Sequence, residues 1–366
     1  MTPICLQPDR IFDGEALCDG FVTLTDGRVS AITRTPTGPT RRITGTLTPG
    51  FLDLQVNGGG GVLLNTTPTP EGMAAIAAAH RRFGTVGILP TVITDAPEVL
   101  DRVAASAIAA KGRPGILGLH IEGPHISLPR RGTHAARFIR PLDARTIKVV
   151  EALRAADVAV MITVAPEAVS PGQIARLAAT GAVVSIGHSD ATAEHTRACL
   201  AEGARCFTHL YNAMSPMHSR APGVTGACIN STAWAGIICD GIHVADEMVA
   251  LALRARPKAD TTFLVSDAMP TVGGPDHFNL YGADIRVVNG QLVNAEGSLA
   301  GAHVTMAESL SRLINVLGID PAAALRMATT IPARVIDLPG GLIGQRAEDL
   351  LMLGPDWSVL STGIAA

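Results

Sequence analysis

The stretch GFLDLQVNGG, residues 50–59, is the first of eight short runs that decide the fold. Each run is apolar, is rich in β-branched residues and is closed by polar residues or glycine. The other seven are VGILPTVIT (86–94), ILGLHIEG (116–123), VAVMITVAPE (158–167), AVVSIGHSD (182–190), CFTHLYNAM (206–214), GIICDGIHV (236–244) and TFLVSDAM (262–269). Runs of this kind are typical of strands that are buried on both faces.

Alanine-rich segments with helical periodicity separate several of these runs. They cover 70–84, 96–112, 171–181, 191–203 and 245–257, and several have an acidic residue near the start and glycine or proline at the end. Eight alternations of strand and helix predict an α/β fold, a parallel (β/α)8 barrel like that of the TIM barrel. A doubly wound open sheet is the alternative, but no Gly-x-Gly-x-x-Gly or phosphate-loop motif supports it.

The two ends of the chain have a different pattern from the middle. FVTLTDGRVSAIT (21–33) alternates apolar and polar residues around an Asp-Gly turn, and DLLMLGPDWSVLST (349–362) is also hairpin-like. We therefore expect residues 1–47 and 333–366 to form one small β-domain beside a barrel at 48–332. An Asn-Gly turn at 289–290 predicts a further hairpin after the eighth strand.

The composition narrows the class of protein. The chain has 366 residues, 47% of them hydrophobic and 17% charged, so it can bury a large core. A net charge of -3 without basic or acidic runs gives no footprint for nucleic acid or a membrane surface, so small molecules are the expected partners. No signal-peptide core and no stretch of about 20 apolar residues is evident, which predicts a cytoplasmic protein. Six cysteines without a Cys-x-x-Cys pair are expected to be reduced thiols.

Polar residues gather where the predicted strands end. Because active sites of such barrels lie at the carboxyl ends of the strands, these side chains would share one rim. A single histidine in an apolar run is more often a hydrogen-bonded core residue, but the joint pattern favours a site. The rim residues are Gln55, Asn57, Glu122, His188, His209, Asn212, Asp240, His243 and Asp267.

The ordered motifs of this chain resemble those of a known family. They are LHIEGPH, GTH, GHSDA, THLYNAMSPMHSRAPG, DGIHV, VSDAM and GSLAGAHVTM. Together, over nearly the whole chain, they resemble the N-acetylglucosamine-6-phosphate deacetylases of the amidohydrolase superfamily. The resemblance implies a metal-bearing barrel with a small β-sandwich built from both termini. It also implies hydrolysis of the acetamide of N-acetylglucosamine 6-phosphate to glucosamine 6-phosphate and acetate.

The expected metal ligands are Glu122, His188 and His209, one carboxylate and two imidazoles, a set that leaves a divalent ion an open position for water. Zinc is the expected ion, with Fe²⁺, Mn²⁺ or Co²⁺ as alternatives. Many amidohydrolases end the first strand in His-x-His, which helps to hold a second metal. Here Gln55 and Asn57 stand instead, and amides bind zinc weakly, so one metal per subunit is expected. Gln55 would lie near the metal-bound water or the substrate, unless both amides only tie down backbone.

The resemblance also implies roles for other residues. Asp267 matches the family's proton-transfer aspartate, and His134 matches a catalytic histidine near the scissile acetyl group. Arg220 would reach the site of the neighbouring subunit in a homodimer. The full set of expected substrate-binding residues is Gln55, Thr133, His134, Asn212, Ala213, Arg220, Asp240, Gly241, Ile242, His243, Leu299, Ala300 and Gly301.

Two alternatives remain open at this point. The first is the same chemistry on N-acetylgalactosamine 6-phosphate, which differs in the orientation of one hydroxyl that these motifs do not read. The second is a non-catalytic relative that keeps the barrel as a scaffold. Loss of a metal ligand or of the aspartate at 267 would mark such a scaffold, and none of these residues is lost.

Overall fold

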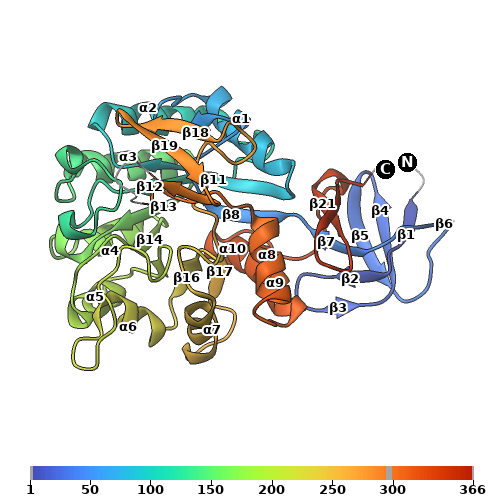
Figure 1. Cartoon of the computed structure of the whole chain (residues 1–366). Helices are drawn as coiled ribbons and strands as arrows, with labels where there is room; N and C mark the ends of the chain where they lie inside the picture. Colours follow the sequence, from blue (N-terminus) through green and yellow to red (C-terminus); the bar gives the residue numbers. More distant parts are fainter. Residues whose placement is uncertain (1–2, 294–298, 365–366) are drawn as a thin grey trace.

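A ring of parallel strands forms the centre of the computed structural model, which describes residues 3–293 and 299–364. The strand order is β17-β16-β15-β14-β13-β12-β11-β8, so neighbours in the sheet follow one another in the chain. The strands are β8 (Phe51–Val56), β11 (Thr85–Ile93), β12 (Gly118–Glu122), β13 (Ala159–Val164), β14 (Val183–Ile186), β15 (Cys206–Phe207), β16 (Trp234–Ile237) and β17 (Thr262–Leu264). Each of the eight predicted runs overlaps one of them, and the barrel prediction is confirmed (Figure 1).

Helices surround the strands. They are α1 (Pro70–Arg81), α2 (Pro97–Ala110), α3 (Ala144–Ala155), α4 (Gln173–Ala179), α5 (Ala193–Ala201), α6 (Gly223–Ile229), α7 (Asp246–Ala255), α8 (Met306–Asn315), α9 (Pro321–Ala328) and α10 (Thr330–Val335). Short 3-10 turns lie at η1 (Leu128–Arg130), η2 (Ala136–Phe138), η3 (Pro166–Ala168) and η4 (Ala347–Asp349). The starts follow capping chemistry: Thr69 accepts from the backbone of α1, and Thr305 with Glu308 forms a capping box on α8. Within the described residues, no helix combines the length and apolar character that a membrane crossing needs.

The ring closes at a seam between β8 and β17. An isolated parallel bridge joins Val56 to Ala268, and the carboxylate of Asp53 accepts from the backbone N–H of Ser266 at 3.2 Å. The same carboxylate accepts from the N–H of Gln55 at 3.1 Å. Burial raises the pKa of Asp53 to about 7. The Asp53 carboxylate therefore supplies hydrogen bonds across the seam, where backbone ladder bonds join the other pairs of strands.

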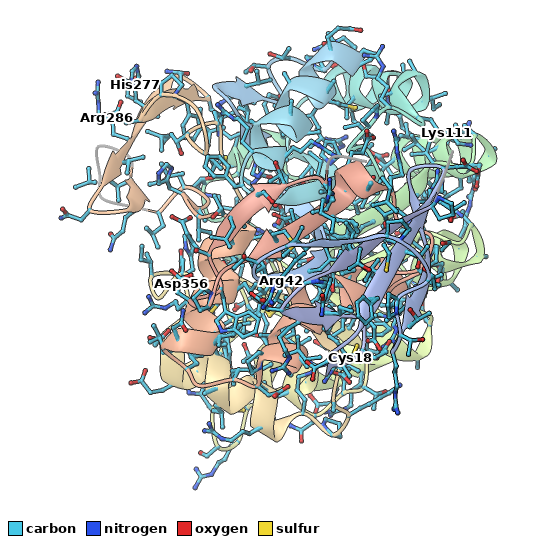
Figure 2. All side chains as sticks on the ribbon, turned by 90° about the vertical axis from the view of Figure 1, so that its right-hand side faces the viewer. Cys18, Arg42, Lys111, His277, Arg286 and Asp356 are labelled. Atoms are coloured by element: carbon cyan, nitrogen blue, oxygen red, sulfur yellow. The ribbon has the colours of Figure 1, made fainter. Side chains whose placement is uncertain are left out.

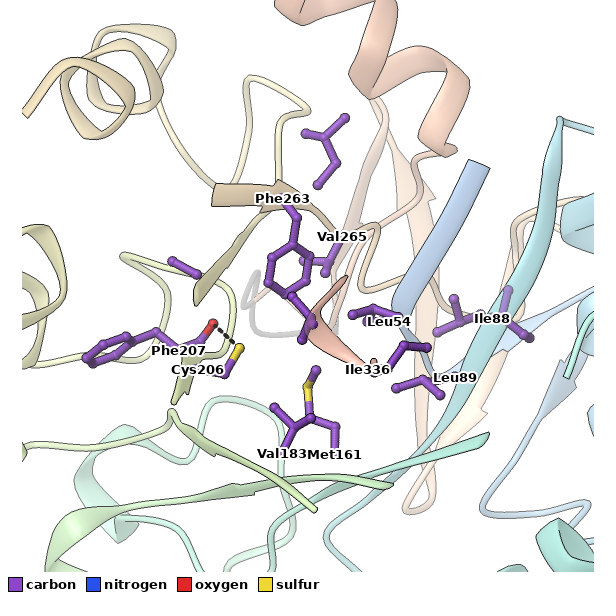
Figure 3. Packing of buried hydrophobic residues seen from close by; sticks show 14 of the residues in the cluster. Leu54, Ile88, Leu89, Met161, Val183, Cys206, Phe207, Phe263, Val265 and Ile336 are labelled. Atoms are coloured by element: carbon purple, nitrogen blue, oxygen red, sulfur yellow. Dashed lines mark hydrogen bonds between the residues drawn. The ribbon is translucent and has the colours of Figure 1, made fainter. Parts of the chain in front are cut away.

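The interior of the ring is layered because alternate strand residues point to the same side. The layer nearer the amino ends of the strands is apolar. Figure 3 shows Met161, Val183 and Phe263, from three strands, pointing toward one another. One step further along the strands lies a hydrogen-bonded layer. In it His120 Nε2 bonds Thr163 Oγ1 at 2.7 Å, and Thr163 bonds Thr208 Oγ1 at 2.7 Å. The candidate site occupies the next layer toward the carboxyl ends.

Both termini contribute to a small domain beside the barrel, as expected (Figure 1). One sheet has the order β5-β4-β1-β6 and the other β22-β21-β7-β2-β3. The strands are β1 (Ile4–Gln7), β2 (Arg10–Phe12), β3 (Leu17–Cys18), β4 (Phe21–Thr25), β5 (Arg28–Thr33), β6 (Thr40–Arg42), β7 (Thr46–Pro49), β21 (Leu350–Leu353) and β22 (Val359–Thr362). Antiparallel pairing of β21 with β7 joins the two ends of the chain. The exact boundaries of 1–47 and 333–366 stay predictions, and their outermost residues lie outside the described ranges.

A small sheet is inserted after the eighth barrel strand. It consists of β18 (His277–Leu280), β19 (Ala283–Val288) and β20 (Gln291–Val293), with Asn289 and Gly290 at positive φ in the turn. This confirms the predicted hairpin, whose continuation at 294–298 lies outside the described residues. Figure 2 shows His277 and Arg286 on this insert, which projects from the body, and Cys18 and Arg42 on the small domain. A two-stranded ribbon, β9 (Gly58–Gly59) and β10 (Val62–Leu63), follows β8. All six cysteines are free thiols, as predicted.

Candidate metal centre and active site

Three buried side chains converge at the carboxyl ends of the strands. Glu122 Oε1 lies 3.0 Å from His209 Nε2 and 3.3 Å from His188 Nε2, and the two imidazole nitrogens are 3.0 Å apart. Glu122 ends β12, whereas His188 and His209 follow β14 and β15 with φ of 46° and 31°. These left-handed turns bring two neighbouring strand ends to a single point. The sequence predicted this set, and the structure places its members together.

The hydrogen bonds of this cluster suit a bound cation. Burial raises the pKa of Glu122, but hydrogen bonds from His188 and His209 outweigh it and hold the pKa well below its usual range. Nδ1 of His188 donates to the carbonyl oxygen of Arg130 at 2.8 Å, which directs its Nε2 into the cluster. Nδ1 of His209 is buried with no hydrogen-bond partner in the described part of the chain. Two imidazole nitrogens and a carboxylate oxygen at such short separation fit a shared divalent ion.

His134 lies beside this cluster and is an alternative candidate for the third metal ligand. Glu122, His134 and His188 can each offer one ligand atom within 4.8 Å of the others. The Nδ1 atom of His134 bonds Thr94 Oγ1 at 2.7 Å, and its ring centroid lies 4.5 Å from that of His188. Burial, with the nearby charge of His188, lowers the pKa of His134 to about 3, so its ring is neutral. The 3.0 Å contacts of His209 with both partners favour His209 as the third ligand.

The side-chain amides of Gln55 and Asn57, at the end of the first barrel strand, form hydrogen bonds with carboxylates. Nε2 of Gln55 donates to Glu122 Oε1 at 2.9 Å and to Asp267 Oδ1 at 3.2 Å. Nδ2 of Asn57 donates to Asp267 Oδ1 at 2.7 Å and also to the Asp267 carbonyl at 3.3 Å. Burial, reinforced by the charge of Glu122, raises the pKa of Asp267 to about 6. Gln55 thus connects the candidate metal ligand Glu122 to the acid-base candidate Asp267, which Asn57 also holds.

A pocket of about 200 Å³ opens above these groups. It contains Glu122, His188, His209 and Asp267 together with several predicted substrate contacts. Its described lining comprises Asn57, Ile93, Glu122, Gly132, Thr133, His134, His188, His209, Asn212, Ala213, His243, Asp267, Met269, Leu299 and Gly301. A largely apolar surface with a few convergent polar groups is typical of a site for a small molecule.

Comparison with known proteins places this arrangement in a family. The model described as "Amidohydrolase family" matches residues 46–348. The chain belongs to the amidohydrolase family. A curated "N-acetylgalactosamine-6-phosphate deacetylase" of Shewanella sp. strain ANA-3 is 39% identical to it, over 95% of this chain and 89% of the relative. An "N-acetylglucosamine-6-phosphate deacetylase" of Haemophilus influenzae is 34% identical, over 86% and 84%.

Solved structures support the assignment of this chain to the amidohydrolase family. The crystal structure of N-acetylglucosamine-6-phosphate deacetylase from Pasteurella multocida superposes with a TM-score of 0.91 at 31% identity, covering 99% of this chain and 98% of that one. A mutant of the enzyme from Mycobacterium smegmatis, in complex with N-acetyl-D-glucosamine-6-phosphate, gives a TM-score of 0.91 at 30% identity with the same coverage. The whole architecture, including the small domain, is shared with these relatives.

Several predicted contacts of the amidohydrolase do not line the pocket. Gln55 is not part of its lining, and Ala300 is held by a hydrogen bond from its N–H to the Leu292 carbonyl at 3.0 Å. Arg220 is exposed and makes no hydrogen bond or ion pair within the described residues. The pocket wall does not include Asp240, Gly241 or Ile242. Of that loop, only His243 faces the described cavity.

Thr94 is a residue that sequence reasoning missed. Its hydroxyl bonds the ring of His134, and its carbonyl accepts a hydrogen bond from the hydroxyl of Tyr281 on the inserted sheet. Thr94 is the polar residue that closes the second predicted run, VGILPTVIT. The rule that identified Glu122 and Asp267 at strand ends could therefore have found it. Ile93 and Met269, which form apolar walls of the amidohydrolase pocket, carry no comparable signal in the sequence.

Proposed function

We propose that this chain hydrolyses the acetamide of N-acetylglucosamine 6-phosphate to glucosamine 6-phosphate and acetate. The observation that carries the proposal is the convergence of Glu122, His188 and His209 with Asp267 in one pocket. Amide hydrolysis needs an activated water and a proton for the departing amine, and this combination supplies both. The names of relatives that share nearly the whole architecture support the same substrate class.

We assign Glu122, His188 and His209 as the residues that would hold one divalent cation. Two imidazoles and one carboxylate are a donor set typical of catalytic zinc, which makes zinc the proposed ion and Fe²⁺, Mn²⁺ or Co²⁺ the alternatives. When bound, such an ion polarises the substrate carbonyl and lowers the pKa of a coordinated water toward about 7. The amides of Gln55 and Asn57 are poor zinc ligands and already bond carboxylates, so one ion per subunit is proposed.

Asp267 is the proposed acid-base residue. Its carboxylate takes a proton from the attacking water and delivers it to the amine nitrogen, because an amide nitrogen leaves poorly unless it is protonated. The pKa of about 6 allows the group both to accept and to donate near neutral pH. Donation from Asn57 and Gln55 to Oδ1 fixes the orientation of this carboxylate.

His134 is the proposed donor to the substrate carbonyl oxygen. This role requires the Thr94 hydroxyl to donate to Nδ1, 2.7 Å away, so that the ring proton lies on Nε2 and its N–H can meet the negative charge that develops on the oxygen. The neutral ring that burial favours is suited to this role, since only one nitrogen then carries a proton.

The sugar and its phosphate would be held by the remaining lining residues. Thr133, Asn212, Leu299 and Gly301 surround the cavity beside His243. A guanidinium forms strong bidentate contacts with phosphate, and Arg220 is free of other partners in the described chain. Because Arg220 does not line the pocket of its own chain, we propose that it serves the neighbouring site in a homodimer.

A phosphorylated substrate crosses membranes poorly, so we propose the cytoplasm as the compartment of this protein.

N-acetylgalactosamine 6-phosphate is the alternative substrate, because the 39% identical relative bears the name of that deacetylase.

The purified protein should be assayed for acetate release from both sugar phosphates, and its metal content measured after loosely bound ions are removed. We expect one divalent ion per chain and the faster turnover on the gluco substrate. Acetate release from neither substrate would contradict the proposed function. Two tightly held ions would contradict the single-metal assignment. Glu122→Gln is the matched control, since it should lose metal and activity together.

A further inference from the structure

The loop after β16 is a hydrogen-bonded unit built around Asp240. Oδ2 of Asp240 bonds His243 Nδ1 at 2.6 Å, and Oδ1 accepts from the backbone N–H groups of Ile242 and His243 at 2.8 Å each. Burial raises the pKa of Asp240, but the bonds from His243 outweigh it and lower the pKa. Asp240 therefore stays charged and orients the His243 ring, which leaves its Nε2 for the pocket.

This unit rests on a guanidinium from another helix. Gly241 has φ of 73°, and a Cβ placed on it would lie 2.1 Å from Nη2 and 2.2 Å from Cζ of Arg312 in α8. The Gly241 Cα is thus in direct contact with the plane of the Arg312 guanidinium. No other residue type fits between the loop and this plane unless one of them moves.

The guanidinium is itself fixed. Arg312 donates from Nε to Asp246 Oδ1 at 2.8 Å and from Nη2 to Asp246 Oδ2 at 2.7 Å. Such a bidentate pair sets the orientation of the plane as well as its position. Asp246 is the first residue of α7, which begins three residues after His243. Figure 1 shows α7 and α8 as neighbours, and the ion pair joins them directly beneath the loop.

We propose that Arg312 is a positioning residue for substrate binding, which clamps α8 to α7 and supports the loop 240–243 so that His243 faces the ligand. This inference rests on the proposed function only for the identity of that ligand. Neither Arg312 nor Asp246 lines the pocket, and their side chains are 32% and 29% exposed. An ion pair with this exposure contributes little to overall stability, so its main effect is on the loop that it supports.

The first test compares kinetics of matched variants. Arg312→Gln should raise KM for N-acetylglucosamine 6-phosphate about tenfold while kcat and metal content stay near the parent values, a change equivalent to about 1.4 kcal/mol of binding. Combining it with His243→Gln should add little to the effect of His243→Gln alone, because both act through the same contact. Arg312→Lys should recover only part of the loss, since an ammonium keeps the charge but not the plane.

Arg326→Gln is the control. Its Arg326–Asp260 ion pair spans 3.0 Å, also joins a late helix to an earlier segment, and lies before β17 at the opposite end of the barrel. This control should leave KM unchanged. An equal rise in KM in both variants, or full additivity with His243→Gln, would overturn the proposal in favour of a general structural effect.

A second readout does not depend on the substrate. Hydrogen exchange of the amides of Ile242 and His243, measured on the metal-loaded protein without ligand, should accelerate in Arg312→Gln and not in Arg326→Gln. Unchanged exchange in Arg312→Gln would overturn the clamp, whatever the enzyme acts on. If neither sugar phosphate is hydrolysed by the parent, the proposed function fails, and accelerated exchange would still support the role of Arg312 in holding the loop.

Discussion

Replacing Thr94 with valine tests whether His134 acts in a fixed orientation. The change preserves side-chain shape but removes the hydroxyl that lies 2.7 Å from His134 Nδ1. His134 is only 5% exposed, so water cannot easily replace the lost partner. The proposed charge stabilisation at the carbonyl oxygen would then depend on a ring that is no longer held.

The size of the effect follows from the buried contact. A buried polar atom left without a partner costs roughly 1–3 kcal/mol, and each factor of ten in rate corresponds to about 1.4 kcal/mol. We therefore expect kcat of Thr94→Val to fall about 10- to 100-fold, less than the roughly 10²- to 10³-fold loss when such a donor is removed altogether. Metal content should not change, because the proposed ligands Glu122, His188 and His209 do not contact Thr94 by any described hydrogen bond.

Steady-state acetate release gives kcat and KM, and elemental analysis gives the metal content. Thr94→Ser keeps the hydroxyl and is the matched control, which should retain most of the parent kcat. Parent-like turnover in Thr94→Val would refute the orienting role of this hydrogen bond. A loss in Thr94→Ser as large as in Thr94→Val would show that turnover depends on the exact fit of the threonine side chain and not on its hydroxyl alone.

Three further changes test the other assignments. Asp267→Asn should keep its metal but lose about 10²- to 10⁴-fold in kcat, and turnover near the parent rate would exclude it as the proton shuttle. Asn57→Leu removes a hydrogen bond that lowers the pKa of Asp267, so this pKa should rise and the acid limb of kcat/KM, where protonated Asp267 cannot accept a proton, should move to higher pH; a limb that stays in place contradicts the contact. Arg220→Ala should weaken binding of the phosphorylated sugar but barely alter turnover of plain N-acetylglucosamine, and equal losses on both would remove Arg220 from phosphate binding. Mixing Arg220→Ala chains with Asp267→Asn chains should restore activity in hybrid dimers, and no gain would place the arginine in its own subunit's site.

The sequence predicts the ring of strands well because its signals are local. Each barrel strand is a short buried run with its own ending, and Asn289-Gly290 specifies a turn within two residues. The site rim follows from the same local signals, since Glu122 and Asp267 close such runs and parallel strands end on one side.

The partners of these side chains could not be predicted because they depend on contacts between distant segments. Asn57 bonds Asp267 across 210 residues of sequence, and Thr94 meets His134 across 40. The sequence left open whether the amides of Gln55 and Asn57 bond carboxylates or backbone groups. Their partners are fixed only when β8 and β17 meet. For the same reason, nothing in the local pattern around Arg312 identifies it as the support for a loop that lies some seventy residues earlier in the chain.

The seam that Asp53 helps to close has a consequence for how activity is acquired during folding. Glu122, His188 and His209 lie at the carboxyl ends of β12, β14 and β15, in the middle of the sheet order, whereas Asp267 reaches them only after the last strand has docked on the first. Bringing these two strands together closes a loop of more than two hundred residues, and the entropy of that closure is compensated only by contacts formed at the end. A chain with most of the ring assembled could therefore gather a cation before it could transfer a proton. With the proposed ligands and proton shuttle, metal binding would report on the middle of the barrel and turnover on its completion.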